Sequence, residues 1–83
     1  MELKDFIKNF ASQFYETDAS EFKANTVFKE DIEEWSSLSV LLIIAMINAE
    51  YNVAIDGSVI NNAETIEDLF NTIKGIKEND GKN

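Results

Sequence analysis

The feature that most constrains the fold is an unbroken apolar run near the middle of the chain, Val40–Ile47 (VLLIIAMI). Periodicity alone does not decide its structure, because a fully buried strand and a buried helix can both show such a run. Length decides, since the segment continues to Tyr51 and exceeds a typical strand. We therefore predict a helix that starts at Ser36 or Ser37. Its inward positions, at helical spacing, are Val40, Ile43, Ile44, Ile47 and Tyr51.

Two further helices are predicted at the ends of the chain. The first has one apolar face and should end near Tyr15 or Glu16; the face consists of Leu3, Phe6, Ile7, Phe10 and Phe14. The last begins at a capping box, Thr65–Asp68, with Asp in place of the usual Glu or Gln. Its apolar face is formed by Ile66, Leu69, Phe70 and Ile73. A short helical turn is predicted at 58–61, after the turn signal Asp56-Gly57-Ser58.

A long polar stretch, 17–34, connects the first two helices. Connections of this length are uncommon unless they are functional or pack through their own hydrophobic side chains. The spaced Phe22, Val27, Phe28 and Ile32 favour packing, and Trp35 is expected to plug the loop against the helices. The predicted fold is all-α, a bundle of three main helices plus a short fourth. We expect a single domain over 1–77 and a flexible C-terminal tail over 78–83.

Composition excludes several functions. The chain has no Cys and no His, so thiol nucleophiles and the commonest general base and metal ligand are missing; we expect neither catalytic residues nor a metal site. The net charge of −9 argues against binding to nucleic acid or to anionic membranes, because both are negatively charged, and it favours protein partners with basic patches. No segment has the roughly 18 apolar residues of a membrane span. We expect a cytoplasmic monomer that is not an enzyme.

The stretch Glu33–Val40 (EEWSSLSV) places two hydroxyls at the start of the central helix. Ser is among the best N-cap residues, which accounts for one of them, Ser36. The second, Ser37, stands in the first turn, where unpaired N–H groups and the helix dipole favour a phosphate. This position suits covalent attachment of a phosphodiester-linked group.

The segment Phe28–Leu41 resembles the modification region of acyl carrier proteins. The family hallmark is Asp-Ser-Leu, in which the Ser carries 4′-phosphopantetheine, and many relatives have a Trp just before it. The segment Thr65–Leu69 resembles the start of the family's last helix. The match continues into the family's second helix and the apolar turn after it, where this chain has Ile43, Ala45, Ile47, Glu50, Tyr51, Val53 and Ile55. The resemblance spans most of the chain.

The resemblance implies that Ser37, which directly precedes Leu38, bears 4′-phosphopantetheine. The group would hold an acyl or aminoacyl cargo as a thioester for fatty-acid, polyketide or related biosynthesis. Ser36 takes the place of the family Asp, a departure that affects recognition by the phosphopantetheinyl transferase. The alternative is therefore a degenerate, unmodified helical module that binds a basic protein partner.

The resemblance also implies a docking surface for that transferase and for acyl-transferring or condensing enzymes with basic patches. Family members often carry acidic residues on the exposed side of their second helix. In the corresponding helix of this chain, Leu42, Ala45 and Ala49 should face outward instead, with Ser39 and Met46 at one margin. The acidic residues of this chain lie just before the helix, at Glu30, Asp31, Glu33 and Glu34. The predicted partner-binding residues are Glu33, Glu34, Ser36, Leu38, Leu42 and Ala45. A cargo pocket would lie among Ile43, Ile47, Ile55, Ile60 and Phe70.

Overall fold

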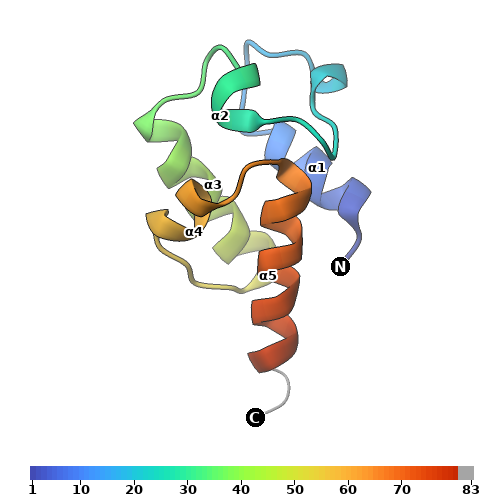
Figure 1. Cartoon of the computed structure of the whole chain (residues 1–83), viewed down its shortest axis with the longest axis vertical. Coiled ribbons are helices and arrows are strands. Elements are labelled where there is room, and N and C mark those ends of the chain that lie inside the picture. The colour runs from blue at the N-terminus through green and yellow to red at the C-terminus, as the bar shows by residue number, and fades with distance from the viewer. Residues whose placement is uncertain (81–83) are drawn as a thin grey trace.

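The computed structural model describes residues 1–80, and all of its regular structure within that range is helical. Figure 1 shows three longer helices, α1 (Leu3–Ala11), α3 (Ser37–Tyr51) and α5 (Ile66–Asp80), with a short α4 (Gly57–Asn62). The all-α bundle of three main helices and a short fourth is thereby confirmed. The long connection adds a 3-10 turn, Ala19–Glu21, and one turn of helix, α2 (Phe28–Asp31).

The helices enclose one core. α1 packs against α3 and α5, and α4 packs against α3 and α5. In Figure 1, α5 runs along the molecule, and α2 and the 3-10 turn lie at the end opposite the C-terminus. Side chains at the expected inward positions are fully buried: Phe6 and Phe10 from α1, Ile43 and Ile47 from α3, and Ile66, Leu69 and Ile73 from α5.

The long connection packs through its own hydrophobic side chains, as predicted. Phe22, Phe28 and Ile32 are all buried. The connection also supplies acceptors for the start of α5, since the Ile66 N–H donates to the Thr26 carbonyl at 3.2 Å. The Thr65–Asp68 capping box forms at the same start of α5, as expected, with Thr65 N–H donating to the Asp68 carboxylate at 3.0 Å and Asp68 N–H donating to the Thr65 hydroxyl at 3.1 Å. The connection is therefore an integral layer of the fold.

The first helix ends earlier than predicted. α1 stops at Ala11, and the next two residues form a turn closed by Gln13 N–H to Phe10 O (3.2 Å) and Phe14 N–H to Ala11 O (3.1 Å). The Ser12 hydroxyl donates to the Asn9 carbonyl at 2.7 Å, a local bond that competes with helix continuation. Phe14 is still buried, but it reaches the core from the turn. The helical prediction for residues up to Tyr15 was wrong because the turn places Phe14 equally well.

The C-terminal helix extends to Asp80, so residues 78–80 are helical where a tail was expected. Residues 81–83 lie outside the described range. The domain limit at residue 77 stays a prediction. No helix in residues 1–80 is long and apolar enough to span a bilayer.

Candidate modification site at the start of α3

Two serines cap the N-terminus of α3. Ser36 is the N-cap, as predicted, and it forms a capping box with Ser39. The Ser36 N–H donates to the Ser39 Oγ at 3.0 Å, and the Ser39 N–H donates to the Ser36 carbonyl at 3.0 Å. Ser39 was expected at the margin of the helix and is instead buried, with 4% of its surface exposed, because its hydroxyl turns back to the cap. Met46 was placed at the same margin and is also buried, at 5% exposed.

Ser37 is the first residue of α3 and is exposed. Unlike Ser36 and Ser39, it is not part of the capping box. The first backbone N–H groups of a helix have no intrahelical partner, and the helix dipole is positive at this end. The residues present therefore fit a phosphate ester at this hydroxyl.

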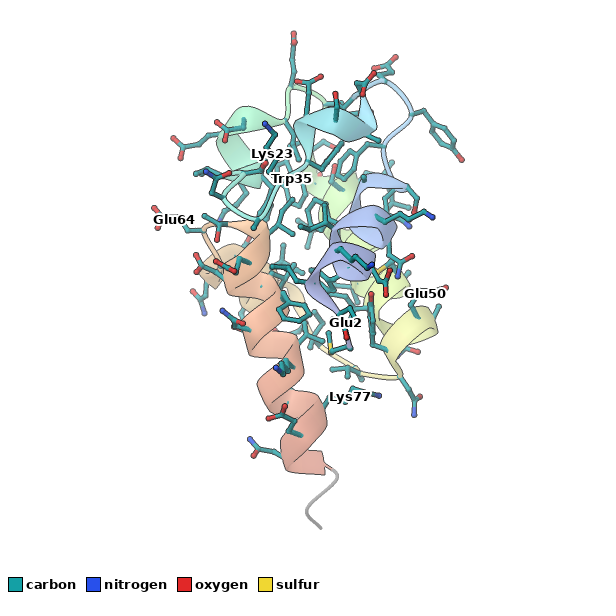
Figure 2. The ribbon with its side chains drawn as sticks, turned by 90° about the vertical axis from the view of Figure 1, so that its right-hand side faces the viewer. Glu2, Lys23, Trp35, Glu50, Glu64 and Lys77 are labelled. Carbon is teal, nitrogen blue, oxygen red and sulfur yellow. The ribbon has the colours of Figure 1, made fainter. Side chains whose placement is uncertain are left out.

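Trp35 fixes the segment that leads into α3. Its ring lies 5.0 Å from that of Phe28, 6.0 Å from that of Phe14 and 6.3 Å from that of Phe10, measured between centroids. Figure 2 labels Trp35 among the side chains at the α2 end of the bundle. The prediction that Trp35 packs the loop against the helices is confirmed. The chain is therefore anchored to the core at Trp35, two residues before Ser37.

The exposed face of α3 next to Ser37 is apolar. Leu38, Leu41 and Leu42 are 60%, 64% and 37% exposed, and Ala45 is also exposed. Leu42, Ala45 and Ala49 face outward as predicted. The outward position of Leu41 was missed, although it follows from spacing, because 38, 41, 42 and 45 share one face of a helix.

The acidic residues upstream of Ser37 divide into two kinds. Glu30, Asp31 and Glu33 are exposed, whereas Glu34 is half-buried. The Glu34 Oε1 accepts hydrogen bonds from the Thr17 N–H at 2.8 Å and the Thr17 hydroxyl at 2.6 Å. Asp31 accepts a hydrogen bond at 2.9 Å from the N–H of Val27, the residue that precedes α2. Glu34 therefore has a structural role in addition to the docking role predicted for it, and Glu33 is the more available carboxylate.

The side chains predicted for a cargo pocket meet in the core between α3, α4 and α5. Ile43, Ile47 and Ile60 have no exposed surface, and Phe70 has 7%. Ile55 is half-buried against the same cluster. In this structure the five side chains are close-packed, so a cargo chain would enter only if the helices separated.

Comparison with known proteins agrees with this geometry. A family model described as "Phosphopantetheine attachment site" matches residues 5–73, which include most of α1, all of α2, α3 and α4, and the first half of α5. Comparisons with curated proteins and with solved structures found no match. Proteins of the matched family carry 4′-phosphopantetheine covalently on a Ser and work with a phosphopantetheinyl transferase and biosynthetic enzymes. The match covers most of the chain, and the protein therefore belongs to the phosphopantetheine attachment site family, in agreement with its resemblance to acyl carrier proteins.

Proposed function

We propose that this protein is a non-catalytic carrier whose 4′-phosphopantetheine is attached to Ser37. One observation supports this residue above its neighbours. Of the three serines at the start of α3, Ser36 is exposed but is the N-cap residue, and Ser39 is buried with its hydroxyl bonded to the Ser36 N–H. Ser37 is exposed, lies inside the matched range and directly precedes Leu38, as in the family pattern.

Loading requires little from the carrier itself. The Ser37 Oγ attacks the phosphorus of coenzyme A that bears the pantetheine arm, a P–O ester bond forms, and the pyrophosphate bond breaks to release adenosine 3′,5′-bisphosphate. The seryl proton passes to a general base on the transferase. When bound, the group supplies a terminal thiol that holds an acyl or aminoacyl cargo as a thioester.

The residues of this chain hold and present the attachment point. The capping box fixes the first turn of α3, and the ring contacts of Trp35 anchor the preceding segment. The positive end of the α3 dipole stabilises the phosphate by about 0.3–1 kcal/mol. A fatty-acyl, polyketide or aminoacyl cargo is compatible with this arrangement. The carrier acts as a monomer in the cytoplasm.

Partner enzymes dock on the apolar face of α3 and on the acidic residues before it. Leu38, Leu42 and Ala45, together with Leu41, form the apolar part, and Glu33, with Glu34 and Ser36 beside it, forms the polar rim. An apolar patch with an acidic rim fits an apolar surface edged by Lys or Arg. The partners are the transferase and acyl-transferring or condensing enzymes of that description.

The attachment site is tested by intact mass after incubation with coenzyme A and a phosphopantetheinyl transferase. The wild-type chain should gain one phosphopantetheine, Ser37→Ala should gain none, and Ser36→Ala should still be loaded. Circular dichroism shows whether each variant is folded, because Ser36→Ala removes a cap worth about 1 kcal/mol. Loading that depends on Ser36 would refute the assignment to Ser37.

The docking surface is tested by the affinity of the loaded carrier for a partner enzyme. Leu41→Ser should weaken binding about tenfold, as expected for an apolar side chain at the centre of an interface, whereas Ala49→Ser should change it little. The loss caused by Leu41→Ser should be the same at low and high salt, because an apolar contact is not screened. Equal effects of both substitutions would contradict the docking role of this face.

A second candidate function is an unmodified helical module that binds a basic partner. The observation that favours it is Ser36, which occupies the place of the family Asp. In that case no transferase would add mass to the chain, and binding of a basic partner would require Glu33 and its acidic neighbours. Failure of several transferases to load the folded wild-type chain would support this function over the first.

A further inference from the structure

A second apolar surface lies on α1, away from the α3 docking face. A groove of about 510 Å³ runs along one side of α1 and onto the connection that follows it. Its apolar lining comes from Ile7, Ala11 and Phe14, with Ala19 from the 3-10 turn. Ala11 and Phe14 are buried and form its floor, whereas Ala19 is exposed at its edge. The volume lies within the range of small-molecule sites, roughly 300–1,000 Å³.

The charge at this groove is opposite to that of the protein. Lys4 and Lys8, both exposed, line it one helical turn apart, and no acidic side chain lines it. The whole chain carries a net charge of −9 with only seven basic residues. Two ammonium groups beside an apolar floor therefore form a local site for an anion attached to a hydrocarbon group.

We propose that this groove binds a single-chain amphiphile with a carboxylate head group. The hydrocarbon chain would lie over Ile7, Ala11 and Phe14, and the carboxylate would lie beside Lys4 and Lys8. From Lys4 to Ala11 the groove follows α1 for about 10 Å, at 1.5 Å per residue, and then continues to Ala19, so it suits an extended chain. A single negative charge suits it better than a doubly charged head group, because the surrounding protein is acidic.

The groove is connected to the modification site through aromatic contacts. Phe14 forms part of its floor, and the ring of Phe14 lies 6.0 Å from that of Trp35 at 28° between planes. Trp35 is the only Trp in the chain and precedes Ser37 by two residues. An amphiphile that shifts Phe14 would therefore alter the surroundings of Trp35. This inference does not depend on attachment at Ser37 and can be tested on the unmodified chain.

The test is titration of the full-length chain with dodecanoate below its micelle concentration, in about 0.1 M salt. At that ionic strength the Debye length is about 10 Å, so distant carboxylates are screened more than the two lysines at the groove. The expected result is a saturable change in Trp35 emission. Backbone amide NMR shifts should be largest over residues 4–19. The double variant Lys4→Gln/Lys8→Gln should weaken binding about tenfold.

Two matched controls separate this site from general adsorption. Lys23→Gln/Lys74→Gln removes the same charge from exposed lysines that do not line the groove and should leave binding unchanged. Ala19→Leu fills the groove from its exposed edge, leaves the core untouched and should weaken binding with both lysines present. Equal binding of the non-ionic dodecyl maltoside, equal losses in both lysine pairs, or amide shifts centred on another surface would each overturn the proposal.

Discussion

Replacement of Glu34 by Ala tests how the long connection is held. The Glu34 Oε1 accepts three hydrogen bonds, from the Glu16 N–H at 3.2 Å, the Thr17 N–H at 2.8 Å and the Thr17 hydroxyl at 2.6 Å. These bonds join the turn after α1 to the segment that enters α3. Glu33 has the same charge, is exposed and lies one residue away, so Glu33→Ala is a matched control.

The expected loss for Glu34→Ala follows from these contacts. A net hydrogen bond contributes about 0.5–1.5 kcal/mol, and bonds to a charged group more. Here three donors share one oxygen on a half-buried side chain, and water can replace part of the interaction, so we expect a loss of about 1–2 kcal/mol. The free energy of unfolding of an 83-residue domain is roughly 4–12 kcal/mol. The variant should therefore remain folded and be measurably less stable.

Urea unfolding followed by Trp35 fluorescence measures this loss. With a slope of about 1 kcal/mol per M, the midpoint should fall by about 1–2 M in Glu34→Ala, and the free energy should change by under about 0.5 kcal/mol in Glu33→Ala. The amides of Glu16 and Thr17 should exchange faster in Glu34→Ala, because they lose their acceptor. Equal midpoints for the two variants, or unchanged exchange at Glu16 and Thr17, would refute the structural role of Glu34.

Three further predictions concern stability. Phe10→Ala, which removes a fully buried ring that packs against other core rings, should lower the free energy of unfolding by about 3–5 kcal/mol in urea denaturation. Gly75→Ala should raise the free energy of unfolding by about 0.5–1 kcal/mol in chemical denaturation, because Gly75 lies inside α5 and an added Cβ meets nothing within 4 Å. Burial raises the pKa of Tyr51 above its ordinary value of 10.0, so the folded state favours the neutral phenol. That contribution is complete below pH 10 and is lost as pH rises through the raised pKa, so wild type should lose more stability than Tyr51→Phe in chemical denaturation as the pH is raised above 10. Tyr15→Phe, at a 98% exposed position, should behave as wild type.

The bundle and the position of the candidate serine could be predicted from sequence because both depend on local patterns. The apolar spacing in α3 and α5 places Ile43, Ile47, Ile66 and Leu69 on inward faces, and those faces are buried. The Ser36 cap and the Thr65–Asp68 box are local hydrogen-bond patterns, and both formed. Leu41 could have been placed outward by the same spacing rule.

Other features depend on contacts between segments distant in sequence. α1 can end at Ala11 because Phe14 packs against Phe22 and Trp35 from a turn as well as it would from a helix. The structural role of Glu34 requires Thr17 to lie beside it, and spacing along the chain does not reveal that neighbour. The groove on α1 likewise depends on the connection that follows this helix, because Thr17 and Ala19 line it together with residues of α1.

The amino-acid sequence alone determined that this chain forms helices, which faces they bury and which serine precedes the leucine at the start of α3, because periodicity and capping act within a few residues. Only the tertiary structure decided that Ser37 is exposed while Ser39 is buried, that Glu34 holds the long connection, and that Lys4 and Lys8 border an apolar groove. Burial and pairing of this kind arise when separate segments pack together, and no local pattern specifies them.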